Sequence, residues 1–469
     1  MTPTQTPAQH RTALGFRSLH DEVSVDALPL EGALPDWLTG SLLRTGPAQW
    51  EVGAERMRHW FDGFAMLHRF AFSGGTVSYA NKVLDGFARR AAQDEQRIVY
   101  SEFATDPCRS IFQRVQTLFK PGLSDNANVN LAQLGERFVT MTETPLPVEF
   151  DPRTLQAAGV PYATPGILTT AHPHRDRDGD AMLNYAAKLG PRSSYRFFRQ
   201  ADLDAEPQVL ASIPVKEPAY MHSFGLSERW LVLAEFPFVV NPLRLALAGR
   251  PYIENYRWKP ERGTRFTLVD RRTGEAHGPF ATDACFAFHH VNAYDDEHGN
   301  VVVDLAVFDD PAIVDDLYLD RLRAGKAVAW ATLERFTVSP TRGTVERRRL
   351  CDEPLELPRI NYGRHNERPY RYVWAAGASD WLDRIVKVDL DDGSVRRWQE
   401  EGSFPGEPVF VAAPGGEAED DGVLLSIVLD TARETSYLLV LDAADLSEVA
   451  RARVPHHIPF GFHGQYARV

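Results

Sequence analysis

The residues with the clearest chemical capability are four histidines in largely apolar surroundings. His172 lies in TTAHPHRD, His222 in EPAYMHSFGL, His289 in AFHHVNAY and His463 in PFGFHGQY. Imidazole nitrogens are good ligands for first-row transition metals, and the sequence has no aspartate-rich loop or cysteine pair that would compete for such an ion. The four histidines are separated by 50, 67 and 174 residues, so they belong to different elements and not to one helix. The pattern indicates a metal site assembled where several elements meet.

Two of these histidines have another histidine close by, and strand geometry distinguishes the members of only one pair. His289 and His290 are consecutive in a run that has the composition of a buried strand, so their side chains should point to opposite faces. Strict alternation gives the two histidines different neighbours on their faces: Ala287, Val291 and Ala293 for His289, and Phe286, Phe288 and Asn292 for His290. Small neighbours leave room for an ion, which favours His289. Periodicity does not choose between His172 and His174.

The elements that must position these residues are mainly short strands joined by tight turns. SGGT (73–76), RRTGE (271–275) and LDDGS (390–394) each separate two apolar or alternating runs, as hairpin turns do. Helical periodicity is confined to a few insertions, CRSIFQRVQTLF (108–119), NPLRLALAG and DLYLDRLRAGKA. We therefore predict an all-β fold in one domain over residues 1–469, with a flexible extension at 1–20. A β-propeller accommodates this many hairpins and leaves a central axis for a site, but the repeat signature is too weak to count blades.

Composition narrows the class of partner. The chain has 469 residues and a formal net charge of −13, without a basic block. Binding to nucleic acid needs clustered Lys and Arg, so we expect no nucleic-acid partner, and no obligate protein partner is evident. The three widely spaced cysteines favour a reducing cytoplasm. The N-terminus lacks the apolar segment of a secretion signal, and no stretch reaches the roughly 18 apolar residues of a membrane-spanning helix.

Six motifs together resemble the carotenoid cleavage oxygenases. They are HWFDGFAMLH (59–68), TAHPH (170–174), YMHSFGL (220–226), FHHVNAYDD (288–296), FPGEPVFV (404–411) and GFHG (461–464). In addition, LLRTGPAQW resembles the Arg-x-Gly-Pro with which that family opens. The resemblance extends from about Gly40 to Val469, with the motifs in the family's order and spacing. DPCRSIFQRVQTLF, SDNANVN and the C-terminal stretch look most like the animal branch, which includes enzymes that cleave carotenoids centrally.

The resemblance implies a fold and a set of metal ligands. The fold is a seven-bladed β-propeller with a helix and loop cap over an axial iron site, and the cap includes insertions at about 108–120 and 236–260. The four ligands of a non-haem Fe(II) are then His172, His222, His289 and His463. Carboxylates that orient these imidazoles are also implied, with none on His172 and one on each of the others. These carboxylates are Glu143 for His222, Glu356 for His289 and Glu407 for His463.

The resemblance also implies a dioxygenase reaction. Four protein ligands leave coordination positions open on iron for O2, beside an electron-rich, apolar polyene. The expected reaction cleaves one carbon–carbon double bond of a carotenoid or apocarotenoid near its centre (15,15') and releases retinal-type aldehydes. The alternatives are cleavage of a phenolic stilbene, isomerisation of a retinoid, and an iron-free propeller that binds lipid.

An apolar stripe suggests how an insoluble substrate reaches the protein. Residues 108–120 contain five apolar side chains at helical spacing, flanked by basic residues: Ile111, Phe112, Val115, Leu118 and Phe119. Such a stripe is also typical of a core helix, so both interpretations remain open. Together with 236–249, which includes Phe236 and Phe238, it predicts a monotopic surface at the mouth of a substrate tunnel. The protein would then be cytoplasmic and peripherally associated with the inner face of the membrane.

Overall fold

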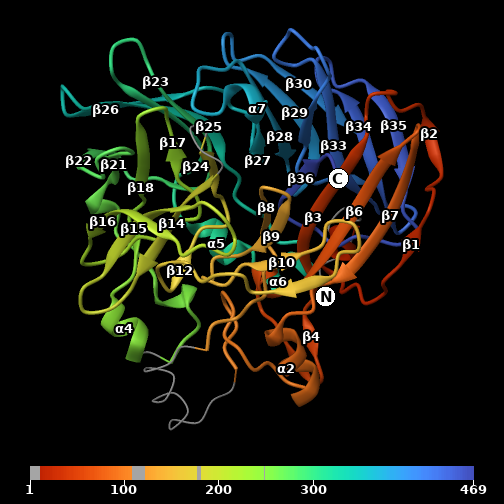
Figure 1. Cartoon of the computed structure of the whole chain (residues 1–469), viewed down its shortest axis with the longest axis horizontal. Coiled ribbons are helices and arrows are strands. Elements are labelled where there is room, and N and C mark those ends of the chain that lie inside the picture. The colour runs from red at the N-terminus through yellow and green to blue at the C-terminus, as the bar shows by residue number, and fades with distance from the viewer. Residues whose placement is uncertain (1–10, 108–121, 177–180, 248) are drawn as a thin grey trace, which may run out of the picture.

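Antiparallel sheets dominate the computed structural model, which describes residues 11–107, 122–176, 181–247 and 249–469. Seven sheets of four to six strands surround a central axis as the blades of a β-propeller (Figure 1). The predicted all-β, seven-bladed fold is confirmed. Within most blades consecutive strands pair with one another, because short turns bring them together.

The first four blades each have four or five strands, hydrogen-bonded in series. Blade 1 contains β1 (Ser24–Val25), β7 (Thr76–Val83), β6 (Phe64–Ser73), β3 (Gly40–Gln49) and β36 (Gly464–Ala467). Blade 2 contains β11 (Ala157–Gly159), β10 (Val148–Phe150), β9 (Arg137–Met141) and β8 (Asn130–Leu134). Blade 3 contains β12 (Leu168–Thr169), β14 (Ala181–Lys188), β15 (Ser194–Gln200) and β16 (Gln208–Pro214), with β13 (His174–Asp176) also on β14. Blade 4 contains β17 (Gly225–Leu226), β18 (Trp230–Glu235), β21 (Thr264–Asp270) and β22 (Ala276–Thr282).

The remaining blades follow the same plan. Blade 5 contains β23 (Phe286–Asp295), β24 (Val301–Phe308), β25 (Thr332–Ser339) and β26 (Thr344–Arg349). Blade 6 contains β27 (Leu355–Arg359), β28 (Tyr372–Ala378), β29 (Leu382–Asp389) and β30 (Val395–Gln399). Blade 7 contains β2 (Leu30–Gly32), β35 (Glu448–Arg453), β34 (Thr435–Asp442), β33 (Gly422–Asp430) and β31 (Ser403–Pro405), with β32 (Val409–Ala412) also on β33. Two small ribbons stand apart, β4 (Glu51–Val52) with β5 (Glu55–Arg56) and β19 (Phe238–Val239) with β20 (Arg257–Trp258).

The helices are short and lie between strands. In the described part of the chain the α-helices are α2 (Phe87–Glu95), α4 (Pro242–Leu247), α5 (Ala312–Asp316), α6 (Leu319–Arg323) and α7 (Tyr362–His365). The 3-10 helices are η1 (Thr12–Phe16), η2 (Trp60–Asp62), η3 (Ile253–Asn255) and η4 (Pro260–Arg262). The helical patterns in NPLRLALAG and DLYLDRLRAGKA correspond to α4 and α6, whereas the pattern at 108–119 lies outside the described residues. Among the residues that the structure describes, no helix is long and apolar enough to cross a membrane.

Residue chemistry accounts for the strand layout. Every residue of β24, VVVDLAVF, is buried, as expected for a strand packed on both faces inside a blade. The three predicted hairpin turns lie between β6 and β7, β21 and β22, and β29 and β30, where they were expected. Gly74 and Gly75 have φ of 53° and 74° in the first of these turns, a conformation that glycine adopts without strain.

The two ends of the described chain close the ring of blades. The C-terminal strand β36 pairs with the N-terminal strand β3, with Ser41 opposite Ala467 and Arg44 opposite Gly464. In Figure 1 the red strands of the N-terminal region and the blue strands of the C-terminal region consequently lie side by side. This closure places the residue just before β36, His463, close to the axis.

One prediction about the N-terminus is wrong in part. Residues 1–20 were expected to form a flexible extension, but Phe16 is only 1% exposed. Its ring packs edge-on against Trp60, Trp381 and Phe460, with centroid distances of 6.1, 5.1 and 5.2 Å. The segment from Thr12 onwards therefore belongs to the fold, because burying an aromatic ring stabilises its position. Residues 1–10 lie outside the described part of the chain.

Candidate metal centre

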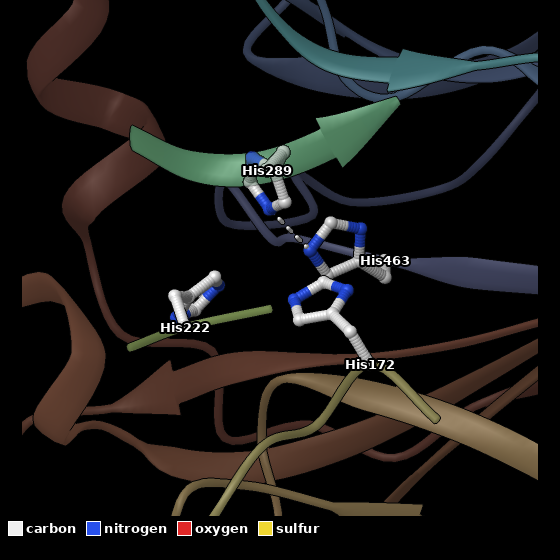
Figure 2. Close-up of side chains that lie close together, drawn as sticks. All are labelled: His172, His222, His289 and His463. Carbon is white, nitrogen blue, oxygen red and sulfur yellow. Dashed lines mark hydrogen bonds between the residues drawn. The ribbon is translucent and has the colours of Figure 1, made fainter. Parts of the chain in front are cut away.

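The four predicted histidines come from three neighbouring blades and from the strand closure. His172 lies between β12 and β13, His222 lies just before β17, His289 is within β23, and His463 immediately precedes β36. Each is therefore at or near the inner strand of a blade. Figure 2 shows their rings converging on one point.

The ring nitrogens of the four histidines are close enough to share one ion. One nitrogen from each ring lies within 4.8 Å of the others. The Nε2 atoms of His289 and His463 are 3.2 Å apart, which is the contact dashed in Figure 2. Two ligands at about 2.1 Å from a metal are about 3.0 Å apart at a right angle and about 3.4 Å apart at a tetrahedral angle. The observed separation falls between these two values.

Each of three imidazoles is oriented by a glutamate. His222 Nδ1 is 2.7 Å from Glu143 Oε1, and His289 Nδ1 is 2.5 Å from Glu356 Oε2. His463 Nδ1 is 2.7 Å from Glu407 Oε1. These are the three pairs that the resemblance implied. A carboxylate is an acceptor only, so each Nδ1 carries the proton and each Nε2 presents a lone pair.

The arrangement fits a cation better than it fits a hydrogen-bonded cluster. With both Nδ1 atoms protonated, the facing Nε2 atoms of His289 and His463 are two acceptors, which repel unless a positive ion lies between them. His172 Nε2 is buried and has no hydrogen-bond partner among the described residues. A buried ring nitrogen without a partner is costly unless a ligand satisfies it. The donor set of neutral imidazoles suits a first-row transition metal.

Burial favours the neutral form of three of these imidazoles, those of His172, His222 and His463. It lowers the pKa of His463 to about 4, against the opposing effect of Glu407, and it also lowers the pKa of His172 and His222. Burial alone would raise the pKa of Glu407, but Arg359, His463 and Arg44 together lower it to about 2. At neutral pH these three imidazoles are therefore uncharged while Glu407 is ionised, the protonation states that metal binding requires.

The neighbouring histidines His174 and His290 take other roles. His174 Nε2 is 3.0 Å from the carbonyl oxygen of Phe224, and His290 Nδ1 is 2.7 Å from Ser223 Oγ. The strict alternation expected for β23 is wrong, however, because the register with β24 shifts between Ala287 and His290 and again between His290 and Asn292. The extra residue of the first bulge lets Phe288 and His289 line the same cavity.

That cavity lies beside the histidines. Its walls are mainly aromatic and aliphatic, and they include side chains from η2, β23, β24, the α5 region, β27 and the C-terminal segment: Trp60, Phe61, Phe288, Phe308, Ile313, Leu317, Leu357 and Phe462. His222, His289 and His463 form part of the wall. An apolar ligand in this cavity would lie directly against the imidazole cluster.

Comparison with known proteins identifies the family. A sequence model of the family described as retinal pigment epithelial membrane protein matches residues 16–468. The chain belongs to this family, that of the carotenoid oxygenases. It is 34% identical to the mitochondrial carotenoid-cleaving dioxygenase of Macaca fascicularis, a match that covers 93% of this chain and 90% of the relative. It is also 34% identical to the human beta,beta-carotene 15,15'-dioxygenase, over 93% of this chain and 91% of the relative.

Solved structures of carotenoid oxygenases have the same architecture. A variant of Synechocystis apocarotenoid oxygenase superposes with a TM-score of 0.87 at 27% identity, covering 98% of this chain and 99% of the other. The cobalt-substituted form of the Synechocystis enzyme gives a TM-score of 0.86 at 26% identity, with the same coverage. The blade arrangement of this family member is thus common to relatives of low sequence identity.

Sequence reasoning missed several residues that surround the histidine cluster. The Tyr220 hydroxyl donates to Glu143 Oε1 at 2.6 Å, and the Thr170 hydroxyl donates to the carbonyl of His222 while accepting from the backbone N–H of His172 at 3.0 Å. Both stand two residues before a predicted ligand. A search for hydrogen-bonding side chains two positions from each histidine would have found them.

The predicted membrane-facing residues divide into two groups. Ile111, Phe112, Val115, Leu118 and Phe119 lie outside the described residues. Phe236 and Phe238 are only 2% and 9% exposed, and they pack against Phe286. Their expected place on an exposed apolar face is wrong, because blade packing buries them. In the same segment Leu243 of α4 is 64% exposed.

Proposed function

We propose that this carotenoid oxygenase is an Fe(II)-dependent dioxygenase that cleaves a carbon–carbon double bond of a carotenoid or apocarotenoid. The observation that carries the proposal is the convergence of four imidazoles, three of them oriented by glutamates, on the wall of an apolar cavity. His172, His222, His289 and His463 would hold the iron. When bound, ferrous iron supplies the electrons through which O2 becomes reactive toward the alkene.

The chain's own residues perform positioning and exclusion of water. The glutamates fix the tautomer and direction of three imidazoles, as their hydrogen bonds indicate. The aromatic wall, which includes Phe61 and Phe288, keeps an extended polyene beside the ligands and away from water. In the overall reaction one C=C bond and the O–O bond break while two C=O bonds form. This balance needs no net proton transfer, in agreement with a cavity whose carboxylate, Glu356, is already engaged with His289.

We further propose that the cut falls near the centre of the polyene, at the 15,15' bond, and yields retinal-type aldehydes. The support is the name of the human relative, beta,beta-carotene 15,15'-dioxygenase, together with its coverage of 93% of this chain. The relatives named for carotenoid cleavage favour this reaction over cleavage of a stilbene.

Access to the substrate is proposed to occur at a membrane surface. The support is the amphipathic pattern of residues 108–120 in the sequence and the exposed Leu243 on α4. We propose peripheral association of a cytoplasmic protein with the inner face of the membrane. The free, buried thiols of Cys285 and Cys351 are compatible with a reducing compartment.

Product analysis tests the proposed function. Protein loaded with Fe(II) is incubated separately with β-carotene, an apocarotenal and resveratrol, and the products are identified by mass. We expect retinal-type aldehydes from the first or second substrate, and none when iron is chelated. Aromatic aldehydes from resveratrol alone, or no product from any substrate by protein with a full complement of iron, would overturn the proposal.

A further inference from the structure

The segment that carries His463 is held from two sides by arginines. The Arg44 guanidinium donates from Nη2 to the carbonyl oxygen of Phe462 at 2.9 Å. The Arg359 guanidinium donates from Nη2 to the carbonyl oxygen of Gly464, also at 2.9 Å. The backbone on either side of the histidine is thereby fixed by a side chain from another strand: Arg44 comes from β3, in the same blade as β36, and Arg359 comes from β27 in blade 6.

The carboxylate that orients His463 takes part in the same network. Glu407 accepts from His463 Nδ1 with Oε1 and from the backbone N–H of Gly464 with Oε2, at 2.7 and 2.8 Å. Arg359 Nε lies 3.6 Å from Glu407 Oε1. Glu407 is fully buried, so its negative charge requires a compensating group, and Arg359 supplies one.

The other two glutamates are supported in a different way. Glu143 accepts from the Tyr220 hydroxyl, and Glu356 accepts from the backbone N–H of Leu357 at 2.6 Å. Both supporting groups are neutral donors. The support of Glu407 by a charged side chain therefore distinguishes the C-terminal ligand.

Glycines allow the arginines to approach this segment. A Cβ at Gly464 would come within 2.6 Å of Arg44 Cγ, and a Cβ at Gly46 would come within 3.1 Å of the Cα of Gly461. Arg44 and Gly46 belong to the Arg-x-Gly-Pro sequence of β3, and Gly461 and Gly464 belong to GFHG. The two motifs lie against each other where β36 pairs with β3, so the strand pairing that closes the propeller also brings Arg44 to the segment before His463.

We propose that Arg44 and Arg359 are positioning residues that clamp residues 462–464, so that closure of the propeller sets the position of His463 as a metal ligand. This inference rests on the proposed function, because it assigns the clamp to a metal site. The clamp acts through the backbone carbonyls of Phe462 and Gly464 and through Glu407. It does not act by direct contact of either arginine with the Nε2 atom of His463.

Binding of Co(II) to the metal-free protein tests the clamp. Arg359→Gln removes both the charge and the bond to Gly464. Arg359→Lys keeps the charge but loses the planar guanidinium with its several N–H donors. Arg371→Gln is the matched control, because Arg371 forms a comparable bond to Asp389 on the outside of blade 6 at 2.7 Å and its side chain is 49% exposed. Affinity is measured by calorimetry, coordination by the visible absorption of the bound cobalt, and folding by the melting temperature of each metal-free variant.

We expect Arg359→Gln to weaken Co(II) binding by about 10- to 100-fold, the usual effect of losing a partner behind a metal ligand. The cobalt spectrum should change, Arg359→Lys should lie between the parent and Arg359→Gln, and the melting temperature should match that of Arg371→Gln. Arg44→Lys should behave like Arg359→Lys if it folds.

Two results would overturn the clamp alone. One is parental affinity and spectrum in Arg359→Gln. The other is a loss of affinity that is accompanied by an equivalent fall in the melting temperature of the metal-free variant, since that result would assign Arg359 a purely structural role. A parent protein that binds no cobalt would instead overturn the proposed function, and this inference with it.

Discussion

Replacing Glu407 with Gln should weaken the metal site and also destabilise the fold. Both oxygens of Glu407 are used, Oε1 by His463 Nδ1 and Oε2 by the N–H of Gly464. A glutamine keeps one oxygen, so its amide NH2 must face a donor. A hydrogen bond to a charged group contributes about 1.5–3 kcal/mol, and a bond between neutral groups about 0.5–1.5 kcal/mol. When the carboxylate becomes a neutral amide, the bond to His463 therefore loses about 1–1.5 kcal/mol, which corresponds to roughly tenfold in metal affinity. The unpaired N–H of Gly464 adds about 1–3 kcal/mol of destabilisation.

Glu356→Gln is the matched comparison for Glu407→Gln. Glu356 uses a single oxygen, Oε2, to accept from both His289 Nδ1 and the N–H of Leu357. The amide oxygen of a glutamine can take over both bonds, and its NH2 group then faces neither donor. We expect Glu407→Gln to lose about 10- to 100-fold in metal affinity and to unfold at lower urea concentration, and Glu356→Gln to lose roughly tenfold with nearly unchanged unfolding. Calorimetric metal titration and urea unfolding of the metal-free proteins measure these effects. Equal losses in the two variants would refute the reasoning.

Three further predictions concern the ligands, the pH dependence and the membrane. His289→Ala should abolish iron binding while His290→Ala retains it, because His290 bonds to Ser223 and not to the cluster; equal iron loss in both would contradict this assignment. Burial lowers the pKa of His463 from 6.5 to about 4, so on acidification the unfolded chain takes up this proton before the folded protein does. The free energy of unfolding of the metal-free protein should therefore fall as the pH falls from about 6.5 to about 4, by up to about 1.4 kcal/mol per pH unit. A urea unfolding series should show a smaller fall in His463→Gln, and an identical profile would be contrary evidence. Replacing Phe112 and Phe119 with Ser should weaken liposome sedimentation without changing iron content, and unchanged sedimentation with loss of folding would show that the stripe is core.

Sequence alone predicted most of the fold and the identity of the converging residues. Hairpin turns such as SGGT carry local information, because glycine at positive φ and flanking alternation are short-range properties. The blade count came from family resemblance, since it depends on how strands pair at long range. The same limitation applies to Phe16, whose burial depends on Trp381 and Phe460 in distant parts of the chain.

The site could be predicted as a set of residues but not in its details. Histidines in apolar surroundings indicated a metal site, because burying an unpaired imidazole is costly unless it has a partner. The bulges of β23 were not predictable, since a two-residue period assumes regular pairing, and they moved Phe288 to the side of the cavity. Arg44 and Arg359 were missed as neighbours of His463, because their contacts depend on ring closure.

The most direct test of the central claim is turnover under oxygen-18 gas. The iron-loaded protein is incubated with β-carotene or an apocarotenal in ordinary water. The aldehyde products are reduced at once to alcohols, so that their oxygen atoms stop exchanging with water, and their masses are then determined by mass spectrometry. We predict two products from each cleaved molecule, each with one oxygen-18 atom, and no turnover in His463→Ala. Unlabelled products, or undiminished cleavage by protein that lacks this ligand, would contradict the account.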